Sequence, residues 1–297
     1  MGKENHGSLR GACHGSMGER RVALLTGNLD INFLGVKMMR AIIVLMILTL
    51  PQNVLAVPLV IEKVPSYNWY HGCSPTAAAS IMGYWDLNGY DNLFDAQGWH
   101  DVKLTEKIKD HISSPAHNAK FDPHPDDSTL PNPPDTSIAD FMNTSEGSLS
   151  YGSTWVTNID DGLREYPAYR GYRFSSQYVS LSWETFVDEI ASGMPVLLNV
   201  DSRGDGGVDH SMTGIGYEDR GVDGLWYASY NTWHEAETMD WYRWRSPSSD
   251  YRFGVSSMIS VHPLDRPDKA NSVPEPPTIL LLVIGIIGIF NFRCWKR

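Results

Sequence analysis

An apolar run near the N-terminus marks where the foldable part of the chain begins. Residues 41–50 are apolar, follow the basic Arg40, and precede a small residue at Ala56. This order of a positive charge, a short apolar run and a small residue is typical of a secretory signal peptide. We therefore expect a signal peptide over residues 38–56, and we interpret residues 1–37 as an upstream extension or a mis-assigned start.

A second apolar run lies at the C-terminus. Residues 273–276 read Val-Pro-Glu-Pro, residues 278–292 are apolar, and a basic cluster closes the chain. The apolar run is short for a stable bilayer helix, and its basic end should stay on the cytoplasmic side. The tail resembles the PEP-CTERM sorting signal, which an exosortase processes in Gram-negative bacteria that make exopolysaccharide. The resemblance implies a linker over residues 266–277, a transmembrane sorting tail over residues 278–297, and an exosortase-type enzyme as a partner. The alternative is a plain membrane anchor.

The segment between these ends is acidic and long enough for one domain. Residues 57–272 contain 15 Lys and Arg against 31 Asp and Glu, a formal net charge of −16. Recognition of nucleic acid requires a basic surface, so this charge excludes nucleic acid as a partner, and an anionic membrane surface is excluded for the same reason. We expect one exported domain over residues 57–265 with a full hydrophobic core, held at the membrane until its tail is processed and then in the cell envelope or extracellular matrix.

The hydrophobic pattern changes from helical to strand-like along this domain. Residues 104–112 and 183–192 have apolar side chains at helical spacing, and Gly193 ends the second segment. Residues 113–134 are rich in Pro, Asp and His and predict a long surface loop. We expect helices at residues 74–86, 104–112, 137–142, 160–169 and 183–192, and strands at 195–200, 210–217, 225–230 and 258–262. Helices followed by an antiparallel sheet predict an α+β fold.

Cys73 is the only cysteine of the predicted mature domain, because Cys13 and Cys294 lie in the terminal segments. A single cysteine in an exported domain has no internal disulfide partner, so Cys73 is either a buried small hydrophobe or a reactive thiol. Ser74 and Pro75 favour a helix start beside it. The N-terminus of a helix stabilises a thiolate, so we expect Cys73 to be reactive.

A base and an orienting residue follow Cys73 in the order that thiol catalysis requires. His210 begins a predicted strand 137 residues after Cys73, and Asn231 ends the next strand 21 residues later. The first spacing agrees with the roughly 130–150 residues that separate cysteine and histidine in papain-like enzymes. If the two strands pair as a hairpin, His210 and Asn231 are neighbours. Taken alone, His210 fits a core histidine and Asn231 a turn residue equally well.

The motifs around these residues resemble the C39-like cysteine peptidases, a bacterial branch of the papain-like fold. They are Gly72-Cys73-Ser74-Pro75-Thr76 with the downstream 83–86 segment, residues 193–196, and the segments that hold His210 and Asn231. The resemblance covers most of residues 57–262. It implies a papain-like fold in which Cys73 is the nucleophile, His210 the general base and acid, and Asn231 the orienting residue. It further implies an exported peptidase that acts on a peptide or protein substrate.

The oxyanion donor is the point at which the sequence departs from the papain-like pattern. Those enzymes commonly carry a glutamine about six residues before the cysteine, where this chain has Tyr67 followed by Asn68. Asn68 has the required amide group on a shorter side chain, so it is a candidate oxyanion donor together with the backbone N–H of Cys73. The alternative is that Asn68 is an ordinary turn residue.

We expect no metal and no cofactor. The histidines at 100, 111, 117 and 124 lack the short spacing of a zinc site, and the two Asp-rich loops at 86–91 and 201–207 lack the twelfth-position glutamate of a calcium loop. The main alternative to an enzyme is a catalytically inactive papain-like module of the surface or exopolysaccharide matrix, which the missing glutamine permits. The sequence does not separate a protease from an amidase or a transglutaminase-like acyl transferase.

Overall fold

The computed structural model describes residue 39, residues 57–121 and residues 129–264. The chain splits into two compact units after Asn53, and the helices and strands named below belong to the second unit, Val54–Arg297. The predicted upstream extension, linker and sorting tail, and all of the predicted signal peptide except Met39, lie outside the described residues. No helix among the described residues is long and apolar enough to cross a membrane.

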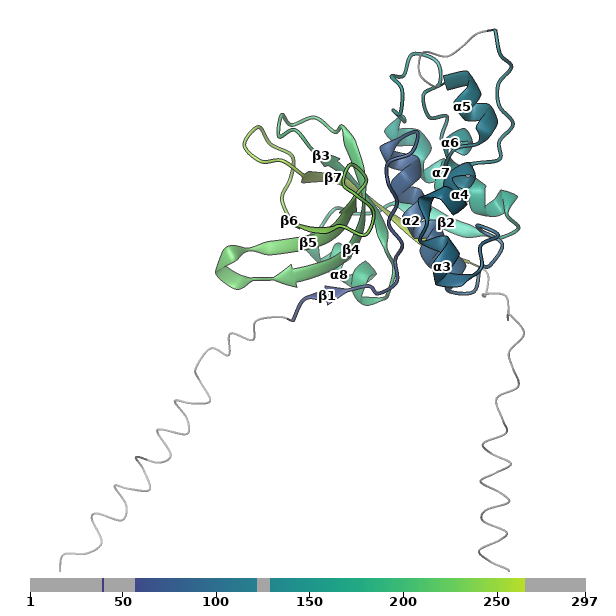
Figure 1. The fold of residues 1–297 in the computed structure, drawn as a ribbon. Helices are drawn as coiled ribbons and strands as arrows, with labels where there is room; N and C mark the ends of the chain where they lie inside the picture. Colours follow the sequence, from purple (N-terminus) through teal and green to yellow (C-terminus); the bar gives the residue numbers. More distant parts are fainter. Residues whose placement is uncertain (1–38, 40–56, 122–128, 265–297) are drawn as a thin grey trace, which may run out of the picture. The chain divides into compact units, whose positions relative to one another are not determined.

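The first half of the domain is helical, apart from a two-residue strand, and the second half is mostly sheet (Figure 1). The helices are α2 (Cys73–Leu87), α3 (Gly98–Val102), α4 (Thr105–Ile112), α5 (Pro115–Phe121), α6 (Ile138–Phe141), α7 (Val156–Tyr169) and α8 (Trp183–Ala191), with a 3-10 turn η1 (Gly221–Asp223). The strands are β1 (Leu59–Val60), β2 (Phe174–Tyr178), β3 (Val196–Asp201), β4 (His210–Asp219), β5 (Leu225–Asn231), β6 (Met239–Arg243) and β7 (Gly254–Pro263).

Within the described residues, all seven strands form one antiparallel sheet. Its order is β2-β7-β3-β4-β5-β6, and β1 adds to β4. β3 and β4 pair from Val196 opposite Gly214 to Val200 opposite His210, and β4 and β5 pair with Met212 opposite Asn231. This register places the start of β4 beside the end of β5, because antiparallel neighbours run in opposite directions.

The central strand β3 is buried on both faces, and its side chains alternate between two cores. Leu197 belongs to the core that includes α2, α4 and α7. Val196, Leu198 and Val200 belong to a second core that includes α8. Figure 1 shows α2 to α7 gathered beside the sheet, with α8 near β1. A strand covered on both faces is expected to be apolar throughout, so the buried Asn199 of β3 is an exception.

α2 is the central helix, and most of its residues are buried. The small side chains of Ala77, Ala78 and Ala79 allow it to pack closely, and the Thr213 hydroxyl of β4 donates a hydrogen bond of 2.9 Å to the Ala77 carbonyl. The N-terminal half of α2 is therefore packed against β4.

The predicted α+β class, with helices first and an antiparallel sheet after them, is confirmed, and several local predictions need correction. The predicted loop over residues 113–134 contains helix α5, which begins at Pro115, because proline is well suited to the first turn of a helix. Strands β1, β2 and β6 and helix α3 were not predicted. β2 is polar along much of its length, and the pattern of β6 does not alternate clearly.

Candidate active site

Cys73 is the first residue of α2, one position before the predicted Ser74 cap. Gly72 takes the N-cap position with φ of 142°. A side chain at Gly72 would approach the Gly152 carbonyl oxygen at 3.0 Å and would adopt an unfavourable backbone conformation. Glycine is therefore required here, and the tight turn places the half-buried Cys73 thiol at the helix N-terminus.

His210 and Asn231 are joined by a hydrogen bond. The Nε2 atom of His210 lies 2.8 Å from Oδ1 of Asn231, which also accepts the backbone N–H of Trp233 at 3.1 Å. Because the amide oxygen can only accept, Nε2 of His210 carries the proton. Nδ1 of His210 is then unprotonated, and it is buried without a hydrogen-bond partner among the described residues. An imidazole in this state can accept a proton.

The orientation of the Asn231 amide is fixed by further contacts. Its Nδ2 atom donates to the Tyr242 hydroxyl at 3.0 Å, and that hydroxyl donates to Asp240 at 3.3 Å. The Trp233 ring stacks on His210 with centroids 3.6 Å apart and covers one face of the imidazole. The imidazole is thus held along its edge by Asn231 and on its face by Trp233.

A buried chain of hydrogen bonds connects the helix of Cys73 to the strand of His210. The Ser74 hydroxyl lies 2.9 Å from the Ser211 hydroxyl, Ser211 donates to Asn199 Oδ1 at 2.8 Å, and Asn199 donates to Ser257 at 3.0 Å. Since the single proton of Ser211 is directed to Asn199, Ser74 is the donor to Ser211. Asn199 thus uses its buried amide to join β3 and β7 to the site.

Cys73 and His210 line one cavity of about 470 Å³. Trp69, Tyr151 and Trp233 contribute aromatic side chains to its wall, and Asn199 and Ser211 contribute polar ones. Trp233 in its wall is 48% exposed, which shows that the cavity opens to solvent there. A substrate bound in this cavity can therefore contact both the thiol and the imidazole, the two groups that nucleophilic acyl transfer uses.

Burial is the largest influence on the ionisation of Cys73 and His210. It raises the pKa of the Cys73 thiol, and the backbone N–H of Ser211 is the first of several hydrogen bonds that oppose the rise. Burial lowers the pKa of His210 to about 4, although the Asn231 hydrogen bond and the charge of Asp209 act in the opposite direction. Burial therefore opposes the thiolate that the helix N-terminus is expected to favour. Both shifts favour the neutral pair of a thiol and an imidazole.

The structure does not bring Asn68, the candidate oxyanion donor, into this cavity. The Oδ1 atom of Asn68 accepts the backbone N–H of Ala236 at 2.8 Å, and the backbone N–H of Asn68 donates to the Thr105 hydroxyl. It lines a separate, more open pocket beside Lys103 and Glu237. The Asn68 side chain therefore holds the β5–β6 loop, and the oxyanion role assigned to it needs correction. Cys73 is the first residue of α2, so its backbone N–H has no carbonyl partner within the helix.

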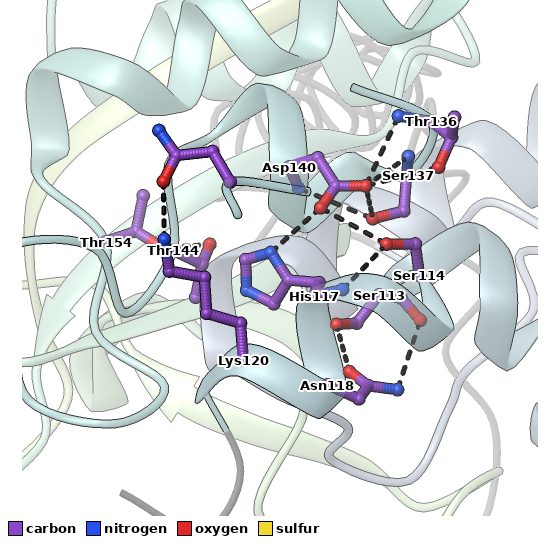
Figure 2. A network of polar contacts seen from close by, with 11 residues as sticks. Ser113, Ser114, His117, Asn118, Lys120, Thr136, Ser137, Asp140, Thr144 and Thr154 are labelled. Carbon is purple, nitrogen blue, oxygen red and sulfur yellow. Dashed lines mark hydrogen bonds and ion pairs between the residues drawn. The ribbon is translucent and has the colours of Figure 1, made fainter. Parts of the chain in front are cut away.

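Figure 2 shows a second buried polar network, which includes the Asp140 carboxylate. The Asp140 carboxylate accepts hydrogen bonds from Nδ1 of His117 at 2.9 Å, from the Ser137 hydroxyl at 2.7 Å and from the Ser114 hydroxyl at 3.3 Å. The His117 ring packs edge to face against His71, two residues before Cys73, at 6.4 Å between centroids. No group of three or more potential metal ligands occurs among the described residues.

Sequence reasoning missed Trp233, Ser211, Asn199 and Tyr242 as parts of the site. Trp233 carried a signal, since it lies two residues after Asn231. Tyr242 belongs to the unpredicted strand β6. Asn199 carried a weaker signal, as the one polar residue in the apolar run of residues 196–200.

The chain is similar to a known peptidase family in sequence pattern. The model of the Peptidase_C39 like family matches residues 61–251. A structure described as a C39-like peptidase from Bacillus anthracis is similar with a TM-score of 0.38 and 13% identity, covering 71% of this chain and 99% of that one. The proform of the Amb a 11 cysteine protease, a major ragweed pollen allergen, is similar with a TM-score of 0.35 and 14% identity, covering 72% and 67%. No curated protein matches the chain.

Proposed function

Because the chain belongs to the Peptidase_C39 like family, we propose that it is a cysteine peptidase that hydrolyses peptide bonds through Cys73, His210 and Asn231. The observation that carries this proposal is the state of His210. Its Nε2–H is held by Asn231, and its unprotonated Nδ1 has no other partner in the described structure. It lines the same cavity as the Cys73 thiol.

The proposed reaction has two halves, formation of a thioester on Cys73 and hydrolysis of that thioester, and each group acts once in each half. His210 takes the thiol proton as the Cys73 sulfur attacks the substrate carbonyl, and the backbone N–H of Cys73 donates to the developing oxyanion. The C–N bond then breaks, and His210 returns the proton to the leaving amine. Water, deprotonated by His210, hydrolyses the thioester and restores the thiol. Asn231 keeps the imidazole in the required tautomer throughout.

Hydrolysis of a fluorogenic peptide library by the purified protein tests this function. Cys73→Ala and His210→Ala should each abolish hydrolysis, because one lacks the nucleophile and the other its base. His100→Ala is the matched control, since the His100 side chain is 85% exposed and does not line the cavity. Hydrolysis that survives in the His210→Ala protein would contradict the proposal.

The alternative is an inactive module of the cell surface or exopolysaccharide matrix that keeps the same fold. Two observations favour it: the pKa of Cys73 is raised by burial, and Asn68 lies outside the cavity. An inactive module should hydrolyse no peptide, and its thiol should react at a rate that His210→Ala does not change.

We also propose that the domain is exported and released after its tail is processed by an exosortase-type enzyme in the envelope of a Gram-negative bacterium. The apolar run at 41–50 and the Val-Pro-Glu-Pro motif at 273–276 support this proposal. The tail would insert into the membrane only transiently. Mass spectrometry of the exported protein tests it, because a mature species that still contains Cys294 would identify a permanent anchor.

A further inference from the structure

One end of the cavity is built by a loop that the proposed reaction does not use. The loop between β3 and β4 contributes Arg203, Val208 and Asp209 to the cavity. Its shape is fixed by Asp201, whose carboxylate accepts the backbone N–H groups of Gly204 and Gly206 at 2.7 Å each. A loop held in this way presents its side chains in a defined position.

The Asp209 carboxylate is only partly satisfied. Its Oδ1 atom accepts the backbone N–H of Ser202 at 2.8 Å. Its Oδ2 atom is buried and accepts no hydrogen bond in the described part of the chain, although Nε of Arg203 lies 2.9 Å away as an ion pair. The Arg203 side chain is 71% exposed. An exposed ion-pair partner is held weakly because water competes for both charges, so another cation can replace Arg203.

The lining of the same cavity is suited to an aliphatic chain. Val208, Trp155, Val156 and Ile159 line the same cavity, and the first two are 43% and 56% exposed. Lysine and arginine side chains place their methylene groups along such apolar surfaces and direct the charged end to a carboxylate. The net charge of −16 over residues 57–272 also attracts cationic peptides.

We propose that this end of the cavity binds a lysine or arginine side chain of the peptide substrate, with Asp209 receiving its charge in place of Arg203. The inference rests on the proposed peptidase function and gives it a substrate class. Arg203 then acts as an internal competitor that covers Asp209 when the site is empty. An acidic peptide is disfavoured, because Arg203 is already paired and the surrounding charge repels it.

Paired peptides measure this preference directly. A position-scanning fluorogenic library is made with arginine against citrulline, with lysine against norleucine and with glutamate against glutamine at each position. The purified protein should prefer the cationic member at one position by on the order of 10-fold in kcat/KM, the range of a hydrogen bond to a charged group. Asp209→Asn should reduce that ratio to about 1, because it keeps the acceptor for Ser202 and removes the charge. Arg203→Ala should raise the ratio, because it removes the competitor.

Asp205→Asn is the matched control, since Asp205 lies in the same loop but does not line the cavity. It should leave the ratio unchanged. Equal cleavage of cationic and neutral peptides, a ratio that survives Asp209→Asn, or a preference for acidic peptides that Arg203→Ala abolishes would each overturn the cationic site alone. If the protein cleaves no peptide, the proposed function and this inference fail together.

Discussion

The hydroxyl of Ser74 lies 2.9 Å from that of Ser211, and each serine directly follows one of the two proposed reacting residues. Ser74 follows Cys73 at the start of α2, and Ser211 follows His210 at the start of β4. Together with the hydrogen bond from Thr213 to the Ala77 carbonyl, this contact joins the helix of the proposed nucleophile to the strand of its proposed base. The link is rigid because both hydroxyls are buried and Ser211 is anchored to Asn199.

Ser211→Ala should lower kcat by on the order of 10²-fold with little change in KM, because a small misplacement of reacting atoms is costly. It should also cost about 1–3 kcal/mol in the free energy of unfolding, since Asn199 and Ser74 lose a buried partner. Steady-state kinetics and urea denaturation measure the two effects. Ser257→Ala is the control at the far end of the same chain. The positioning role is contradicted if both variants lose stability and neither loses kcat.

The pH dependence of kcat/KM should report the buried state of His210. Burial lowers the pKa of His210 to about 4. A general base must be unprotonated, so activity should persist through mildly acidic pH and fall as the pH drops through about 4. Asn231→Ala removes a hydrogen bond that raises this pKa, so the acid limb should move to still lower pH while the maximal rate falls. An acid limb near 6.5, the ordinary histidine pKa, would contradict this account.

Trp233→Ala should move the acid limb in the opposite direction. The indole ring covers His210 at 3.6 Å between centroids, and its removal exposes the imidazole to water. Desolvation is the main cause of the lowered pKa of His210, so the pKa should rise toward its ordinary value. Trp233→Phe, which keeps an aromatic cover, should shift the limb less. The same pH profile for all three proteins would show that Trp233 does not control the solvation of His210.

The hydrogen-bond network of Figure 2 predicts how stability depends on pH. Burial alone would raise the pKa of Asp140, but hydrogen bonds from His117 and Ser137 outweigh it and hold the pKa below its usual value. A carboxyl group with a lowered folded-state pKa stabilises the fold above its unfolded pKa, and this stability is lost as the pH falls through the folded value.

Asp140→Asn should therefore cost about 3 kcal/mol in the free energy of unfolding at neutral pH, and progressively less below about pH 4. Urea denaturation at several pH values measures the difference. Asp135→Asn is the control, because Asp135 is exposed. A loss of stability in the Asp140 variant that stays constant with pH would mean that packing, and not the charge, is responsible.

Sequence patterns predicted the elements that carry the proposed reacting groups, for reasons that are local. α2 follows from the Ser74-Pro75 start beside Cys73, and β4 and β5 follow from short apolar runs. α8, which carries none of these groups, follows from the spacing of its apolar residues and the Gly193 stop. The loop prediction over residues 113–134 missed α5, because proline was interpreted as a helix breaker where it begins a helix.

The parts of the candidate site that the sequence did not predict depend on tertiary contacts. The order of Cys73, His210 and Asn231 along the chain was enough to propose a site, since strand pairing brings the last two together. The link from Ser74 to Asn199 depends on packing between α2 and the sheet, which no local pattern encodes. The direction of the Asn68 side chain depends in the same way on its contact with the distant Ala236.

The rate of Cys73 alkylation by iodoacetamide, measured from pH 4 to pH 10, tests the central claim that Cys73 and His210 act as a pair. With the neutral pair described here, the wild-type thiol should react at pH 7 faster than the His210→Ala thiol by on the order of 10²-fold, because only the wild type has a base to remove the proton. The His210→Ala thiol should react only as the pH approaches or exceeds about 8.5, the value of a free thiol, since burial raises the pKa of Cys73. Equal rates in the two proteins across this range would contradict the pair and identify an inactive module.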